Sequence, residues 1–126
     1  MGRVVTITLP GHPPGGNELH RMTWRQVQKS RETWKRTVEW LVMAVLPKGW
    51  EPITYGYLAV EWRYRVKRNR DLDNLVAGLK PLIDGLVSTG VLADDHSGVL
   101  AQIGPLTVQT GCSADETILT ITEGIP

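Results

Sequence analysis

Two carboxylates, Asp71 and Asp73, stand one residue apart directly after a basic run, in the sequence K-R-N-R-D-L-D-N that covers residues 67–74. A second acidic pair, Asp94 and Asp95, follows later in the chain. Carboxylate oxygens are the ligands that Mg²⁺ and Mn²⁺ prefer, and substrate phosphates can complete the coordination shell. These residues therefore have the right types for a metal site that hydrolyses a phosphodiester, beside basic side chains that hold its backbone.

The lengths of the segments between these acids allow them to meet. A helix over residues 75–88 would be about 21 Å long, at about 1.5 Å per residue. The segment 89–95 spans at most about 23 Å when it is extended, so it just reaches back to the start of that helix. Carboxylates gathered in one place repel one another and raise one another's pKa, and a divalent cation removes this difficulty.

Other local interpretations of the acids fit less well. A calcium loop of the EF-hand type starting at Asp71 needs Asp or Asn at its fifth position and Gly at its sixth, where this chain has Leu75 and Val76. The chain also has no Gly-rich phosphate loop. Taken alone, these residues leave open an ordinary solvated loop in which Asp73 or Asn74 caps a helix.

The basic residues are unevenly distributed, although the net charge is only +1. Most of the Lys and Arg residues lie in two segments, 21–36 and 63–70. In the second segment they alternate with apolar residues, which predicts a half-buried strand over residues 58–67 with a basic outer face. In the first segment Arg21, Arg25 and Lys29 are four residues apart, so they share a face if the helix begins that early.

The remaining elements follow from the hydrophobic periodicity and the positions of Pro and Gly. A strand is predicted over residues 4–10, a loop over 10–16, and a helix capped by Thr23 that runs to about residue 46. A second helix, capped by Asn74, reaches Ser88, and Pro81 either kinks it or leaves a regular helix that starts near Lys80. Two strands, 99–108 and 117–122, complete the chain, and Pro105 is expected to interrupt the first of them. The prediction is an α+β fold of one small sheet and two helices, in the order β-α-β-α-β-β.

Composition adds constraints on organisation and location. The 126 residues predict one domain, residues 1–126. A single cysteine, Cys112, excludes an internal disulfide. The N-terminal sequence lacks the apolar core of a secretion signal, and no apolar run is long enough for a membrane span. We therefore expect a protein of the cytoplasm that does not enter a membrane.

Two long motifs resemble one enzyme family. They are R-D-L-D-N-L at residues 70–75 and L-K-P-L-I-D-G-L-V-S-T-G-V-L-A-D-D at residues 79–95. The segments I-T-L-P-G-H-P-P-G-G-N-E-L-H-R (residues 7–21) and L-T-I-T-E (residues 119–123) add to the likeness. Together they resemble the RusA family of Holliday junction resolvases, and the resemblance covers nearly the whole chain. Members of that family are small, dimeric, Mg²⁺-dependent endonucleases of bacteria and their phages.

The resemblance implies a role for each acid. Asp71, Asp73 and Asp95 would be the essential metal-binding and catalytic carboxylates, Asp94 would be a metal neighbour of lesser weight, and Asp84 would be structural. The cofactor would be Mg²⁺, with Mn²⁺ as a possible substitute. Branched DNA, a four-way junction, would be the substrate, in a bacterial or phage-infected cell. Residues expected to contact DNA are Asn17, Arg21, Arg25, Arg63, Arg65, Lys67, Arg68 and Arg70.

One position departs from the family pattern. Well-known members carry a catalytic lysine four residues after the second Asp, and this chain has Ala77 there. Lys80 follows seven residues after Asp73, and offsets of four and seven share a face of a continuous helix. We expect Lys80 to take over the catalytic role, with Pro81 beside it affecting the geometry.

Three functions are compatible with this pattern. The first is a junction-resolving endonuclease that acts as a homodimer, with the strand 99–108 or the N-terminal strand at the subunit contact. The second is a hydrolase of another phosphate ester that uses the same carboxylates. The third is a module that binds junctions without cutting them, because the usual lysine is replaced.

Overall fold

The computed structural model describes residues 2–124, which form four strands and four helices. The elements in chain order are β1 (Val4–Pro10), α1 (Gly16–Arg21), α2 (Trp24–Val45), β2 (Gly56–Arg63), α3 (Leu72–Val76), α4 (Lys80–Ser88), β3 (Leu100–Gln109) and β4 (Glu116–Glu123). Counting α1 with α2 and α3 with α4, this is the predicted α+β fold with the order β-α-β-α-β-β. The number of helices differs, because two short helices precede the two predicted ones.

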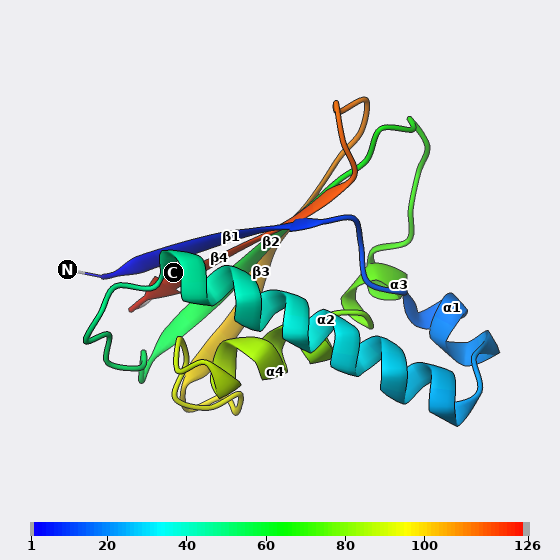
Figure 1. The fold of residues 1–126 in the computed structure, drawn as a ribbon. Coiled ribbons are helices and arrows are strands. Elements are labelled where there is room, and N and C mark those ends of the chain that lie inside the picture. Colours follow the sequence, from blue (N-terminus) through cyan, green and yellow to red (C-terminus); the bar gives the residue numbers. More distant parts are fainter. Residues whose placement is uncertain (1, 125–126) are drawn as a thin grey trace.

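The strands form one mixed sheet in the order β1-β4-β2-β3. β4 pairs antiparallel with β1 and β2, whereas β2 and β3 are parallel. A parallel pair needs a long crossover, and α3 and α4 lie in the segment that makes it. Figure 1 shows α2 and α4 together on one face of the sheet. No helix within residues 2–124 has both the length and the apolar character needed to cross a membrane.

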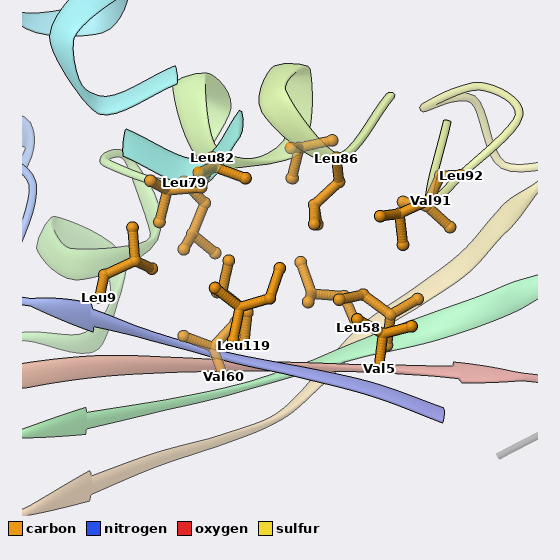
Figure 2. Packing of buried hydrophobic residues seen from close by; sticks show 14 of the residues in the cluster. Val5, Leu9, Leu58, Val60, Leu79, Leu82, Leu86, Val91, Leu92 and Leu119 are labelled. Carbon is orange, nitrogen blue, oxygen red and sulfur yellow. The ribbon is translucent and has the colours of Figure 1, made fainter. Parts of the chain in front are cut away.

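The core lies between this sheet face and the two long helices. Strand residues alternate, so that Val5, Leu58 and Val60 point toward the helices while their neighbours point away. Helix α4 supplies Leu82 and Leu86, which are fully buried against the strands (Figure 2). The alternating and helical patterns of the sequence therefore converge on one hydrophobic cluster.

Helix α2 begins where the sequence predicts. The Thr23 hydroxyl accepts a hydrogen bond from the Gln26 backbone N–H at 3.2 Å, and the Gln26 side chain accepts one from the Thr23 N–H at 2.9 Å. This reciprocal capping satisfies two backbone donors of the helix start. Extended backbone at Met22 and Thr23 separates α1 from α2. The early start that would place Arg21 on the face of Arg25 and Lys29 is therefore not met, because Arg21 ends a different helix.

The predicted strand over residues 58–67 ends earlier, at Arg63. The Tyr64 N–H still donates to the Gln109 carbonyl at 2.9 Å. Beyond this point β3 has ended and β4 has not begun, so the chain has no strand to pair with. The Arg65 N–H instead donates to the Asp115 carboxylate at 2.8 Å. Arg65 and Lys67 therefore lie in a loop, although alternation continues in the sequence.

The segment from residue 72 to 88 is two helices, with the regular one starting at Lys80 as one of the two predicted arrangements has it. Pro81 lies in the first turn of α4, where its missing N–H costs nothing. The prediction that Asn74 caps the helix is wrong. The cap position is Asp71, and Asn74 lies inside α3.

The last two strands fall within a residue of their predicted bounds. Strand β3 runs through Pro105 without ending there. Its pairing with β2 shifts at this point, because Leu58 pairs with Ile103 and Val60 with Leu106. The expected interruption at Pro105 is therefore a change of register within one strand, of the kind that a β-bulge produces.

We predict that Gly85→Ala destabilises the fold. A Cβ atom there would lie 2.8 Å from Val38 Cβ and 3.0 Å from the Lys35 carbonyl oxygen. Alanine favours a helix over glycine by about 0.5–1 kcal/mol, but overpacking costs about 1–3 kcal/mol, so we expect a net loss. Urea denaturation should show a lower midpoint at unchanged slope. A midpoint equal to that of the original protein would mean that α2 and α4 are not held at this contact.

Candidate functional site

The first acidic pair lies at the start of α3. Asp71 occupies the cap position with extended backbone, and Asp73 lies in the first turn. Both residues are exposed, and within residues 2–124 neither carboxylate forms a hydrogen bond or an ion pair with a protein group. Leu75, which is buried, anchors the short helix in the core. Both carboxylates are therefore held on a fixed backbone and are free to bind a cation or a proton donor.

The N-terminal loop and α1 hold α3 in place from the other side. The Asn17 backbone N–H donates to Asn74 Oδ1 at 2.7 Å, so the Asn74 side chain satisfies a donor at the start of α1. A Cβ atom at Gly15 would lie 2.6 Å from the Asn74 side chain, and one at Gly78 would lie 2.7 Å from the Pro14 carbonyl oxygen. Only glycine permits these close contacts, which position the acids just before Asn74. The backbone of Asn17, whose contact with DNA stays a prediction, thus helps to position the acidic motif.

Asp95, one member of the second acidic pair, lies close to Lys80. The Lys80 ammonium is 2.9 Å from Asp84 Oδ1 and 3.4 Å from Asp95 Oδ2. The hydrogen bond with Asp84 is the main reason that the pKa of Lys80 is raised. A hydrogen bond with the Asp94 side chain, and then the Lys80 ammonium, hold the pKa of Asp95 below its usual value. Lys80 and Asp95, two residues predicted to be catalytic, are thus in direct contact.

The two acidic pairs are separate in this structure. Among the residues it describes, 2–124, no group of three or more His, Cys, Asp or Glu side chains is placed to hold a metal ion. The donor chemistry nevertheless suits Mg²⁺, because Asp71, Asp73, Asp94 and Asp95 offer only oxygen ligands and are all exposed. Asp95 and the α3 pair would hold one cation together only if their side chains were placed differently from their arrangement here.

The basic residues that precede the acids form a loop over residues 64–70, beside the connection between β3 and β4 (Figure 1). Arg70 supports this loop from within. Its guanidinium lies 3.4 Å from the centre of the Tyr64 ring and donates to the Val66 and Arg68 carbonyls. Arg63 is ion-paired with Glu61. The guanidinium groups of Arg63 and Arg70 therefore already contact partners within the protein.

The exposed charges of this loop are those of Arg65, Lys67 and Arg68. Lys67, Arg68 and Arg70 line an open hollow of about 610 Å³, together with Asn69, Val108 and Thr110. A surface of this kind is suited to phosphate groups, which attract Lys and Arg regardless of base sequence. Arg70 lies at the rim of a second hollow, so the loop leads directly from this surface to Asp71.

That second hollow, of about 290 Å³, contains residues that sequence reasoning missed. It brings Asp71 together with His12, Glu18 and Tyr64. The His12 ring lies 4.1 Å from the Tyr64 ring, and its Nδ1 is 3.0 Å from the Thr117 hydroxyl. Burial lowers the pKa of His12, which favours the neutral form of the ring. A histidine in a loop rich in Pro and Gly gives no periodic signal, and only the fold brings it to Asp71.

Comparison with models of known protein families and with curated proteins found no match for this chain. The family resemblance therefore rests on the motif residues themselves.

We predict that Arg70 fixes the conformation of the basic loop. Arg70→Ala removes the stacking on Tyr64, worth about 0.5–1 kcal/mol, and two hydrogen bonds worth about 1 kcal/mol each. Amide hydrogen exchange over residues 64–71 should accelerate about tenfold or more, with little change in the core strands. Arg68→Ala is the matched control, since its exposed side chain makes no such contacts in the described part of the chain. Equal exchange in both variants would contradict this role.

Proposed function

We propose that this protein is a Mg²⁺-dependent, structure-selective endonuclease that resolves four-way DNA junctions by hydrolysing paired phosphodiesters. The observation that carries the proposal is the arrangement at α3. Two exposed, unpaired carboxylates, Asp71 and Asp73, directly follow an exposed basic loop that ends at Arg70. The loop supplies charge for the phosphate backbone, and the carboxylates supply oxygen ligands at the point where that backbone would arrive.

The reaction divides among the residues in a simple way. Lys67 and Arg68 would bind the strand, and Asp71 and Asp73, together with Asp95 and its neighbour Asp94, would hold the cation. A Mg²⁺ ion bound there would supply an activated water and stabilise the leaving oxygen. Lys80 would contribute positive charge near the scissile phosphate, where it stabilises the developing negative charge.

The proposal includes two subunits for each junction. A four-way junction is nearly two-fold symmetric, so a two-fold dimer can present one site to each of two opposed strands. The two strands that the sequence offers for the subunit contact are β1 and β3, which form the two edges of the sheet. A bacterial or phage-infected cytoplasm is the location that this substrate implies.

A junction-binding module without catalysis is the second candidate. It is favoured by the contact between Lys80 and Asp95, which occupies a predicted metal ligand. It is also favoured by the separation of the two acidic pairs among residues 2–124. One experiment separates the candidates: a labelled four-way junction is incubated with the purified protein, with and without Mg²⁺. Cutting only with Mg²⁺ supports the enzyme, and binding without cutting supports the module.

The acids should be required for cutting and not for binding. Asp71→Asn, Asp73→Asn and Asp95→Asn should each lower the cleavage rate roughly 100-fold or more, as for other groups that stabilise a transition state. Junction affinity should hold or rise, because a negative charge near phosphates is removed. Asp94→Asn should lose less. A variant of the first three that cuts at the original rate with Mg²⁺ would show that its carboxylate is not a metal ligand.

Lys80 should act on the rate more than on affinity. Lys80→Ala should slow cleavage roughly 100-fold while junction affinity changes little, which is the pattern of an interaction made in the transition state. Asp84→Asn is the companion variant, because it frees Lys80 from its closest partner and keeps the ammonium. Normal cutting by Lys80→Ala would mean that another cation, such as Arg70, fills the role.

A further inference from the structure

The N-terminal half of α2 extends beyond the helix that it packs against. Helix α2 has 22 residues and α4 has nine, which correspond to about 33 Å and about 14 Å at about 1.5 Å per residue. Their contact lies in the later half of α2, where Val38 and Val42 are buried and Val38 meets Gly85. Figure 1 shows the earlier half of α2 continuing past the start of α4 toward α1.

Four residues share one face of α2 over residues 24–35, which covers the projecting half and the first residue after it. Trp24, Gln28, Arg31 and Lys35 follow one another at spacings of four, three and four, which places them in one row along the helix. We call these four residues the α2 stripe. Trp24 is 74% exposed, an unusual position for a large aromatic side chain. The stripe therefore joins an open aromatic surface to two positive charges.

The charges of the α2 stripe are not used by the protein. Within residues 2–124 no carboxylate lies within ion-pairing distance of Arg31 or Lys35. By contrast, Arg36, on another face of the same helix, pairs with Glu32 at 3.0 Å. Arg31 and Lys35 are therefore available to an anion from outside the chain.

Three residues of the α2 stripe face a candidate catalytic residue. A cleft of about 450 Å³ lies between the two helices. Its lining from α2 consists of Gln28, Arg31, Glu32 and Lys35, and from α4 of Lys80 and Asp84. Lys80 also contacts Asp95. A linear anion bound along Arg31 and Lys35 would therefore reach Lys80.

We propose that the α2 stripe binds a DNA strand, with Arg31 and Lys35 on its phosphates and Trp24 stacked on an unpaired base. Positively charged grooves with exposed aromatic side chains suit single-stranded nucleic acid, since stacking accepts any base and the charges follow the backbone. The bases of a four-way junction are paired, and the branch point is where opening of the junction would expose a base to Trp24. The inference rests on the proposed function for its choice of substrate. It extends that function by giving α2 a part in recognising the branch point.

The test measures binding in EDTA, so that it does not depend on catalysis. Fluorescence anisotropy with a labelled four-way junction and a labelled single strand should show about tenfold weaker binding for Arg31→Ala/Lys35→Ala. The slope of log affinity against log salt should become shallower by about 1–2. Trp24→Ala should weaken single-strand and junction binding about fivefold or more, whereas Trp24→Phe should retain most of it.

Matched controls lie on other faces of the same helix. Arg36→Ala removes a paired arginine, and Trp40→Ala removes a tryptophan that is 70% exposed. Neither should change affinity by more than about twofold. If the stripe variants behave like these controls while the original protein binds and cuts junctions, the inference is wrong and the proposed function stands. If the original protein binds neither the junction nor the single strand, both the inference and the proposed function are wrong. Unchanged single-strand binding by Trp24→Ala would also overturn the role of Trp24.

Discussion

The close packing of the N-terminal loop against the break between α3 and α4 determines where Asp71, Asp73 and Lys80 lie. Gly78 can approach the Pro14 carbonyl, and Gly15 the Asn74 side chain, only because neither carries a Cβ atom. Leu75 and Leu79, both buried, fix the two sides of the break in the core. The acids before the break and Lys80 after it therefore belong to one rigid corner, although they lie on different helices.

The range of the deciding contact explains which elements could be predicted from the sequence. Local signals gave correct results where one interaction decides the structure, as at Thr23, whose capping partner lies three residues away. They failed where the partner is distant. Alternation continued to Lys67, but a strand needs a neighbour, and β3 has none to offer beyond Gln109. Helix α1 was missed because its start is satisfied by Asn74, far along the chain.

The candidate site shows the same division. The types and spacing of Asp71, Asp73 and Asp95 were enough to predict oxygen ligands for a cation, and chain length allowed them to meet. Length sets only an upper bound on separation, so it could not show that Asp95 contacts Lys80 in this structure. The placement of His12 beside Tyr64 and Asp71 also depends on a tertiary contact with Thr117 of β4. No periodicity within the N-terminal loop encodes that contact.

Under the proposed function, Lys80 and the cation compete for the Asp95 carboxylate. The Lys80 ammonium and a divalent cation both favour the ionised form of the Asp95 carboxylate, and one oxygen cannot serve both fully. Asp84, only 2.9 Å from the ammonium, provides Lys80 with a second partner one helical turn away. Under the proposed function, transfer of Asp95 to the cation would leave Lys80 held by Asp84 alone. The ammonium would then keep its position at the edge of the cleft, where a phosphate could replace Asp95 as its partner. The move of Asp95 from Lys80 to the cation would thus add a ligand to the metal site. It would also free a positive charge for the substrate.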